Sequence, residues 1–422
     1  MALKNQKKEI LVFANWKELP EPVLMGTLHV TPSKGSEIFS FEYDKDWLKF
    51  GYAQNIDPDL QMYSGHQYTL NEKNNFGVFL DSSPDRWGKV LMKRREAALA
   101  KAEDRKPNTL LESDFLLGVF DGHRMGALRF KLEMDGPFLD DNAKHPAPQW
   151  ASLRELEHAS LELEKDDIIG DPDYIKWLNM LVSPGGSLGG ARPKASIVDN
   201  DGNLWIAKFP SRNDIKDVGA WEAVAHDLAT KAGINMSDAQ VKKFTNKYHT
   251  FLTKRFDRTE KSERIHFASA MTLLGYTDGA DHQAGVSYLE LAEFITQHGA
   301  NVKEDLLQFW KRIVFSICIT NTDDHLRNHG FLLTDKGWIL SPAYDINPIE
   351  DGTGLTLNIS EDDNSLDIDL ALSVASYFRI EEKQAEQIIG EIQQVVSTWK
   401  EVAKKYGLSN GEQQTMSAAF RV

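Results

Sequence analysis

A long apolar stretch that runs directly into a dense polar one constrains this chain more than any other feature. Residues 305–319, DLLQFWKRIVFSICI, repeat apolar side chains at helical spacing and predict a buried helix. Residues 320–330, TNTDDHLRNHG, then bring together two carboxylates, two imidazoles, an arginine and two side-chain amides. A loop that only turns the chain is usually built from Gly, Pro, Asn and Ser. The stretch therefore predicts a functional site where a core helix ends.

Composition and charge narrow the class of protein. The 422 residues suffice for two or three structural units, and 41% hydrophobic with 26% charged residues is typical of globular proteins. The chain has 48 basic and 63 acidic side chains, a net charge of −15, and no long Lys/Arg run. DNA and anionic membranes attract local positive charge, so we expect no direct nonspecific binding to DNA and no membrane contact.

The cysteine content and the N-terminus indicate a cytoplasmic protein. Cys318 has no second cysteine with which to form an intramolecular disulfide or a Cys-based zinc site, and its apolar surroundings predict a buried packing thiol. The N-terminal apolar run is too short for a signal peptide. No stretch reaches the roughly 18 apolar residues that a membrane span needs.

Three zones follow one another along the chain. Residues 1–148 mix short strand-like runs with one helix, SPDRWGKVLMKRREAALAKAED, for which Ser83 is the expected N-cap and Pro84 the first helical residue. Residues 149–257 contain a helix, a Gly-rich segment and two strand-like runs joined by the turn DNDGN. Residues 258–422 are mostly helical and end in one long amphipathic helix, EEKQAEQIIGEIQQVVSTWKEVAKKYG, which Gly407 is expected to stop.

The Gly-rich segment, SPGGSLGGARPKASIV at 183–198, precedes a strand. Glycines let backbone N–H groups approach phosphate oxygens closely, and Lys194 follows within reach of the same loop. No G-K-[ST] sequence follows the glycines, so the segment is not a Walker A loop. Many Gly-rich turns only turn the chain, and this segment alone leaves phosphate binding open.

A strand lysine comes next, Lys208 in NLWIAKFPS, followed by a helix that carries Glu222. Taken alone, an edge-strand lysine that reaches solvent is the simpler interpretation. A strand lysine paired with a helix glutamate is, however, the arrangement with which kinases hold a lysine against nucleotide phosphates. The order of Gly-rich loop, hairpin, lysine and glutamate favours the kinase interpretation.

Within the polar stretch, Asp323 and Asn328 have the spacing of the aspartate and asparagine in the kinase catalytic loop. In kinases the aspartate accepts the proton of the attacking hydroxyl and the asparagine holds a magnesium ion. The following HGFLLTDKGWILSPAYDIN predicts a β-hairpin that turns at residues 335–337 and whose second strand delivers Asp345. That is the place of the kinase magnesium-binding aspartate, although YDIN stands where D-F-G would stand.

Two other interpretations of this loop were weighed. His325 and His329 have the i, i+4 spacing of the zinc motif H-E-x-x-H, but Leu326 replaces the catalytic glutamate and the preceding helix ends before His325. A polar helix terminus capped by Asp323 and Asn328 would explain the loop in isolation. The chain order of all the motifs instead predicts an α+β, protein-kinase-like bilobal fold, with a β-rich N-terminal subdomain and N-lobe followed by a mostly α-helical C-lobe.

The motifs together resemble the HipA family, the serine/threonine-kinase toxins of bacterial toxin–antitoxin pairs, along nearly the whole chain. SLGGARPKA resembles that family's phosphate loop, WIAKFP its lysine strand and FLTKRFDR its hinge strand. NTDDHLRNHGF resembles its catalytic loop and LSPAYDI its metal-binding strand. The upstream FEYDKDWL, SPDRWGKVLM and DFLLGVFDGHRMGALRF resemble its N-terminal subdomain.

The resemblance implies a role for each matching residue. Asp323 would be the catalytic base, Asn328 and Asp345 would hold Mg²⁺, and Glu222 would form a structural ion pair with Lys208. Ser187 stands where family members carry a loop serine whose autophosphorylation inactivates the enzyme. The residues that the resemblance places at ATP are Gly189, Gly190, Ala191, Arg192, Pro193, Lys194, Lys208, Lys254, Arg255, Phe256, His325, Leu326, Arg327, Asn328, Tyr344 and Asp345.

The resemblance also implies partners. The family's toxins are neutralised by a helix-turn-helix antitoxin (HipB-like) that binds its operator, so DNA contact would be mainly indirect. Family substrates include aminoacyl-tRNA synthetases. Two alternatives to an active protein kinase stay open: a catalytically silent nucleotide-binding regulatory subunit of an antitoxin–DNA complex, and a small-molecule phosphotransferase. The presence of Asp323, Asp345 and Lys208 argues against the silent subunit.

Overall fold

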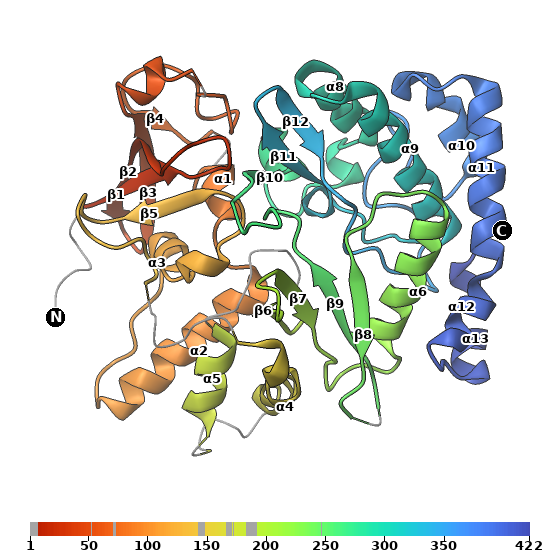
Figure 1. The fold of residues 1–422 in the computed structure, drawn as a ribbon, viewed down its shortest axis with the longest axis horizontal. Helices are drawn as coiled ribbons and strands as arrows, with labels where there is room; N and C mark the ends of the chain where they lie inside the picture. Colours follow the sequence, from red (N-terminus) through yellow and green to blue (C-terminus); the bar gives the residue numbers. More distant parts are fainter. Residues whose placement is uncertain are drawn as a thin grey trace. The chain divides into compact units, whose positions relative to one another are not determined.

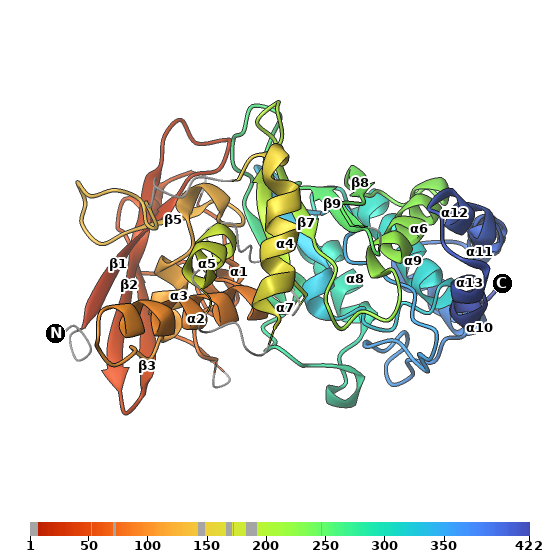
Figure 2. The ribbon, with the colours of Figure 1, turned by 90° about the horizontal axis from the view of Figure 1, so that it is seen from below.

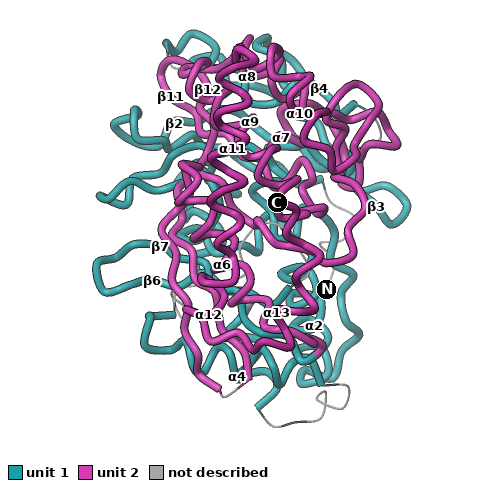
Figure 3. Tube along the Cα trace, turned by 90° about the vertical axis from the view of Figure 1, so that its right-hand side faces the viewer, with its two compact units in different colours: residues 1–212, 257–268 teal, residues 213–256, 269–422 magenta. Residues whose placement is uncertain are grey.

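The chain forms two compact units, each assembled from two separate stretches of sequence (Figure 3). Unit 1 contains Met1–Arg212 and Asp257–Ala268, and unit 2 contains Asn213–Phe256 and Ser269–Val422. The computed structural model describes residues 7–51, 53–70, 73–141, 148–165, 171, 173–182, 192–245 and 247–422. The division into three zones at residues 148 and 257 stays a prediction.

Unit 1 is built on an antiparallel sheet with the strand order β4-β3-β2-β1-β5 (Figure 1). Its strands are β1 (Lys8–Ala14), β2 (Val23–Ser33), β3 (Ser36–Tyr43), β4 (Gln67–Tyr68) and β5 (Leu128–Lys131). The hairpin between β2 and β3 turns at Lys34 and Gly35, both with positive φ. Such two-residue turns match the right-handed twist of the flanking strands.

One face of this sheet is buried under helices. Side chains alternate along each strand, and Leu28 on β2 pairs with Phe41 on β3, with both fully buried. Phe79 of α1 packs against Phe41 at 5.7 Å and against Phe130 of β5 at 6.0 Å between ring centroids. Figure 2 shows the three helices of this region on the same side of the sheet. They are α1 (Gly77–Asp81), α2 (Arg86–Ala102) and α3 (Glu112–Leu117).

Helix α2 begins later than the sequence predicted. Asp85, not Ser83, is the N-cap, and its carboxylate accepts a hydrogen bond from the Gly88 N–H at 2.8 Å. The Ser83 hydroxyl instead donates to the Phe79 carbonyl at 2.8 Å, at the end of α1. Both residues are good N-cap types, and the preceding helix had already engaged the serine.

The rest of unit 1 consists of two helices and a β-hairpin. The hairpin joins β6 and β7, and Asp199 in its turn accepts hydrogen bonds from the Asn203 backbone and the Trp205 ring. This confirms the hairpin predicted around DNDGN. Helix α5 packs against α4 and against α2. The bounds are α4 (Leu153–Leu163), α5 (Tyr174–Val182), β6 (Lys194–Val198) and β7 (Leu204–Lys208).

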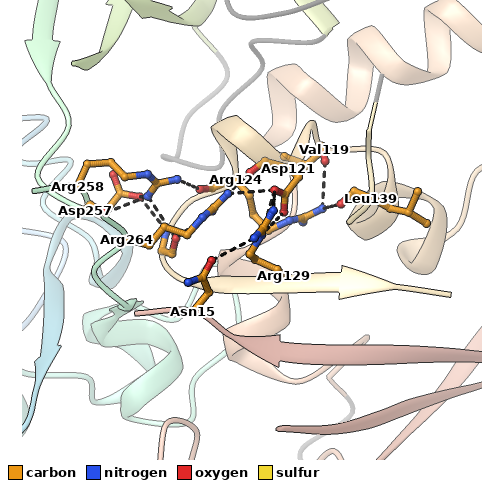
Figure 4. Close-up of polar contacts among 10 residues, drawn as sticks. Asn15, Val119, Asp121, Arg124, Arg129, Leu139, Asp257, Arg258 and Arg264 are labelled. Carbon is orange, nitrogen blue, oxygen red and sulfur yellow. Dashed lines mark hydrogen bonds and ion pairs between the residues drawn. The ribbon is translucent and has the colours of Figure 1, made fainter. Parts of the chain in front are cut away.

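A network of arginines and aspartates fastens the late stretch 257–268 to the early part of unit 1 (Figure 4). The Asp257 carboxylate accepts a hydrogen bond from the Gly126 N–H at 2.8 Å, and Arg258 donates to the Arg124 carbonyl at 2.9 Å. Arg264 donates to the Asp121 carbonyl oxygen at 2.6 Å. These bonds join segments more than 130 residues apart in sequence.

Asp121 is the centre of this network. Its carboxylate lies 2.6 Å from a guanidinium nitrogen of Arg129 and 3.2 Å from one of Arg264. Burial alone would raise the pKa of Asp121, but the two guanidinium groups outweigh burial and hold that pKa below its usual range. The buried carboxylate therefore stays charged.

Unit 2 combines an antiparallel strand pair with a mainly helical region. Strands β8 and β9 pair with each other, and α6 packs against both. Strand β10 (Phe267–Ser269) leads into this region at its last residue. The other elements are β8 (Ala239–Lys242), β9 (Thr250–Lys254), α6 (Val218–Lys231), α7 (Ala270–Leu273), α8 (Tyr288–His298), α9 (Val302–Cys318), β11 (Gly330–Thr334), β12 (Gly337–Leu340), α10 (Ile368–Ser373), α11 (Glu382–Ser397), α12 (Trp399–Lys405) and α13 (Asn410–Met416).

Helix α9 is the centre of the unit 2 core. It packs against α8, α11 and β12, and Phe309, Trp310 and Ile313 on it are fully buried. This confirms the buried helix predicted before the polar stretch. Cys318 in its last turn is also buried, as predicted, and burial raises the pKa of its thiol to about 12.

The final amphipathic segment is two helices rather than the single one predicted. Helix α11 ends at Ser397 and α12 begins at Trp399. The break directs the Trp399 ring onto Phe420, with which it stacks at 4.3 Å, and packing here outweighs helical periodicity. Gly407 follows α12 with a positive φ, as expected of a helix stop. Within the part of the chain that the structure describes, no helix is both long and apolar enough to cross a membrane.

Candidate active site

The polar stretch begins where α9 ends and is held to the chain that follows β12. Thr320 has a positive φ of 52°, which turns the chain sharply after the helix. Asn321 donates to the Ser316 hydroxyl on α9 at 3.2 Å. The side-chain oxygen of Asn321 accepts the Asn347 N–H at 3.1 Å. One amide side chain thus links the helix end, the polar loop and the segment around Asp345.

Asp323 and Asn328 are joined directly, as their spacing predicted. The side-chain N–H of Asn328 donates to the backbone carbonyl of Asp323 at 2.9 Å, across a short 3₁₀ helix at Leu326–Asn328. Asn328 and Leu326 are buried, whereas Asp323 is exposed. The bond uses the amide nitrogen of Asn328, so its amide oxygen can face a cation.

Asp345 does not lie in a strand, contrary to the prediction. Strand β12 ends at Leu340, and Asp345 adopts a left-handed backbone with φ of 56°. The Asn347 side chain donates to its carboxylate at 3.3 Å, and the Tyr344 hydroxyl donates to the Arg327 carbonyl at 2.7 Å. These side-chain bonds, rather than a strand ladder, determine the position of Asp345.

Neighbouring charges perturb the Asp323 carboxyl. Burial is the largest cause that raises its pKa, and the carboxylates of Asp345 and Asp324 raise it further, while His325 opposes them. A carboxylate with a raised pKa is a stronger base near neutral pH. The three clustered aspartates also make a cation at this place favourable.

Asp324, adjacent to Asp323, faces the opposite way and is buried. The Tyr288 hydroxyl donates to it at 2.8 Å, and the Nε2 atom of His329 lies 3.3 Å from its other oxygen. Burial would raise the pKa of Asp324, but His329 and Tyr288 together hold that pKa below the usual range. Asp324 is therefore a structural carboxylate of the loop, and Tyr288 is a partner that no local motif indicated.

The pair His325 and His329 does not form the zinc arrangement that was weighed as an alternative. His329 is buried, with its ring 5.2 Å from the Phe309 ring and its imidazole beside Asp324. His325 has an extended backbone before the 3₁₀ helix, and so the two imidazoles do not share a helical face. The i, i+4 spacing has no structural meaning here.

The predicted adenine segment lies next to Tyr344. Strand β9 ends at Lys254, whose N–H donates to the Asp238 carbonyl at 2.8 Å. The ring of Phe256 packs against the Tyr344 ring at 5.5 Å between centroids. Arg255 between them in sequence is buried. Unit 2 thus brings the residues 254–256 and 344–345 into one neighbourhood.

The remaining predicted ATP residues that the structure describes belong to unit 1. Lys194 on β6 and Lys208 on β7 are opposite each other in the hairpin register, and both are buried. The Lys194 ammonium lies 3.1 Å from the Asp85 carboxylate, which is almost completely buried. The sequence did not indicate this pair. The Pro193 carbonyl accepts the Phe209 N–H at 2.9 Å, which continues the hairpin.

Several predictions are not tested by the described residues. Ser187, Gly189, Gly190 and Ala191 lie outside them, whereas Arg192 is described and half-buried. Glu222 is buried on α6 in unit 2, and Lys208 belongs to unit 1. Their ion pair stays a prediction. Arg327, which has Asp278 within 3.7 Å of its guanidinium, also keeps its predicted place near the phosphates only as a prediction.

The fold and the loop define the class of protein: an α+β protein with a kinase-like catalytic loop. The family described as HipA-like C-terminal domain matches residues 186–399, just over half of the chain. The chain belongs to this HipA-like family, which confirms the resemblance that the motifs predicted.

Individual relatives agree with this assignment. A "putative kinase" of Haemophilus influenzae is 27% identical over 179 residues, which are 38% of this chain and 52% of that relative, so the match spans about half of its length. The serine/threonine-protein kinase toxin HipA of Shewanella oneidensis is 21% identical over 344 residues, 75% of this chain and 71% of that protein.

The fold is similar to a solved structure. In the Shewanella oneidensis MR-1 complex of HipA, HipB and operator DNA, the matched chain aligns with a TM-score of 0.63 at 15% identity. The alignment covers 97% of this chain and 94% of that one. The predicted α+β, kinase-like fold class is confirmed.

Proposed function

We propose that this chain is a serine/threonine protein kinase that uses ATP and Mg²⁺ and acts as the toxin of a toxin–antitoxin pair. The observation that carries the proposal is the bonded loop system in which Asp323, Asn328 and Asp345 converge. The kinase names of the two relatives support the same activity.

The donor set at this loop suits magnesium. Mg²⁺ prefers oxygen ligands, usually one or two carboxylates together with phosphates. Asn328 offers its amide oxygen because its nitrogen is engaged with Asp323, and Asp345 offers its carboxylate. When bound there, the ion would neutralise phosphate charge during transfer.

Asp323 would act as the general base. It is exposed, so a substrate hydroxyl can reach it, and its raised pKa favours accepting the hydroxyl proton. Asn328 would fix the direction of Asp323 through the bond to its backbone carbonyl. Asp324, anchored by Tyr288, would keep the loop in place without touching the reactants.

Nucleotide binding is proposed for residues of both units. In unit 2, the backbone of 254–256 would contact adenine, with Tyr344 beside it. In unit 1, Lys208 and the loop 189–194 would contact the phosphates, and Ser187 would be the autophosphorylation site. A dianionic phosphate on Ser187 would repel ATP phosphates from that loop.

The partners are proposed from the relatives and the charge. The solved HipA is in complex with HipB and operator DNA, and we propose a HipB-like antitoxin as the partner of this chain. A net charge of −15 fits a chain that reaches DNA mainly through such a partner. As substrate we propose a protein of the translation machinery, such as an aminoacyl-tRNA synthetase.

The first test compares the parent protein with Asp323→Asn by intact mass after incubation with Mg·ATP. The parent should gain one phosphate, whereas loss of a general base slows transfer by roughly 10²- to 10⁴-fold. Asp335→Asn is the matched control, because it makes the same substitution at an exposed turn between β11 and β12.

Binding of ATP is measured in parallel by calorimetry. If the parent binds ATP, is isolated unphosphorylated and still gains no phosphate, the kinase proposal is wrong and a silent nucleotide-binding subunit replaces it. Equal phosphorylation of the parent and Asp323→Asn would remove Asp323 from the role of base.

A further inference from the structure

Three metal-ligand side chains gather on the open face of the unit 1 sheet, away from the helices. His29 on β2 and Glu42 on β3 alternate with the buried Leu28 and Phe41, so they point to the face opposite the core. His66 immediately precedes β4, and continuing the register Ser40↔Tyr68 and Phe41↔Gln67 places it across from Glu42. The three residues come from three consecutive strands or their ends.

Their ligand atoms are close enough for one ion. One ligand atom from each of His29, Glu42 and His66 lies within 4.8 Å of the other two. A tetrahedral ion at about 2.0–2.1 Å from each ligand needs ligand atoms roughly 3.4 Å apart. The three side chains are 25%, 43% and 49% exposed, respectively, and can make the small adjustment.

The outer nitrogen of each imidazole also has a polar neighbour. Nδ1 of His29 lies 3.6 Å from the Glu9 carboxylate on β1, and Nδ1 of His66 lies 3.3 Å from the Ser40 hydroxyl. Nε2 of His66 faces the Glu42 carboxylate at 3.8 Å. Metal-bound histidines commonly donate their second N–H to a carboxylate or another acceptor, which fixes the tautomer and the ring.

We propose that His29, Glu42 and His66 form a binding site for one divalent transition-metal ion, best suited to Zn²⁺. Two imidazoles and a carboxylate are the ligand set of open zinc sites, in which water completes the coordination. The imidazoles disfavour Mg²⁺ and Ca²⁺, which take oxygen ligands. Among the residues that the structure describes, this is the group of His, Cys, Asp and Glu side chains that meets the spacing.

The ion would fasten the edge of the sheet. Strand β4 is a two-residue edge strand, paired only through Ser40 and Phe41 of β3. An ion shared by His66, Glu42 and His29 would add a link from this edge to β3 and β2. Metal binding would therefore stabilise unit 1 by mass action. None of the three residues belongs to the proposed kinase site.

The test measures Zn²⁺ binding to the full chain by isothermal titration calorimetry, with Co²⁺ as a spectroscopic probe. His29→Ala, His66→Ala and Glu42→Gln should each weaken the first Zn²⁺ site tenfold or more and remove the visible Co²⁺ band of a tetrahedral site. His298→Ala is the matched control, because His298 is an exposed imidazole outside the cluster, and it should change affinity less than twofold.

The expected result is one Zn²⁺ ion fewer for the double variant His29→Ala/His66→Ala than for the parent, with an unchanged far-ultraviolet circular dichroism spectrum. Equal stoichiometry and affinity in the parent and the double variant overturn the proposal. Displacement of Zn²⁺ from this site by millimolar Mg²⁺ overturns its assignment to a transition metal. Asp323→Asn has no effect on the site in either case, which separates this outcome from that of the kinase test.

Discussion

Two adjacent carboxylates in the catalytic loop have opposite environments. Asp323 is exposed and its pKa is raised, whereas Asp324 is buried beside Tyr288 and His329 and its pKa is lowered. A base needs access to its substrate, and a structural carboxylate needs partners that satisfy its charge. The loop thus separates chemistry and support between neighbouring residues.

Asp324→Asn should destabilise unit 2. The change removes the charge that pairs with His329 inside a buried network, and we expect a loss of about 1–3 kcal/mol in the free energy of unfolding. Urea denaturation followed by tryptophan fluorescence measures it. Tyr288→Phe, which removes only the hydroxyl donor, should cost less. An Asp324→Asn protein as stable as the parent would show that this network contributes nothing to folding.

A buried histidine should make unit 1 sensitive to acid. Burial lowers the pKa of His266 to about 3, so the native state keeps this imidazole neutral. In the unfolded chain its pKa is about 6.5. Between these values the unfolded state binds the extra proton, and stability present above pH 6.5 is lost as the pH falls toward 3.

His266→Phe should reduce this acid sensitivity. The ring packs against Trp16 at 5.4 Å, and phenylalanine keeps an aromatic ring there without a titratable group. The urea midpoint of the parent should fall between pH 7 and pH 4, and that of His266→Phe should fall less. The linkage is worth at most a few kcal/mol. Parallel pH profiles for the two proteins would contradict the assignment.

At the scale of elements, the start of α2 has two functions. Asp85 caps the helix by accepting the Gly88 N–H, and its other oxygen lies 3.1 Å from the Lys194 ammonium on β6. The helix N-terminus itself favours a negative charge. One side chain therefore orders a helix and anchors the strand that follows the proposed phosphate loop.

Substitutions at Asp85 should separate the two effects. Asp85→Asn keeps a good N-cap but leaves the buried Lys194 without its carboxylate, and breaking a buried pair costs about 3–5 kcal/mol. Asp85→Ala should cost roughly 1 kcal/mol more, because the cap is also lost. Circular dichroism in urea measures both. Lys194→Met combined with Asp85→Asn should recover part of the loss, and failure to recover any would argue against the pair.

At the scale of the whole molecule, unit 1 depends on a stretch that arrives late in the sequence. Residues 257–268 are attached to it through Asp121, Asp257 and the arginines around them (Figure 4). The chain must therefore be synthesised past residue 268 before unit 1 can complete its hydrogen bonds. Neither unit corresponds to one continuous segment.

Asp121→Ala should loosen this attachment. Arg129 and Arg264 would lose their shared carboxylate, and an uncompensated buried charge costs about 3–5 kcal/mol. Hydrogen exchange should increase in 257–268 and in β5, and stay unchanged in α11. The control Asp227→Ala removes an ion pair with the exposed Lys405, which we expect to cost less than about 1 kcal/mol. Equal exchange in the parent and Asp121→Ala would rule out the anchoring role.

The sequence by itself determined the features that depend on neighbouring residues. Apolar periodicity predicted α9, turn residues predicted the hairpins at 199–203 and 335–337, and spacing predicted the bond between Asn328 and Asp323. Each involves residues that are close in the chain, where local geometry leaves few arrangements. Local rules were less reliable at boundaries, as the start of α2 and the division of the last helix show.

Only the tertiary structure decided which distant side chains meet. Asp324 finds Tyr288 36 residues away, Lys194 finds Asp85 on another element, and His66 arrives beside His29 and Glu42 through sheet pairing. The sequence shows that each residue is polar, but a polar residue can equally face solvent. Packing of whole elements brings these groups together, because the core must bury its apolar faces before the polar groups between them can be paired.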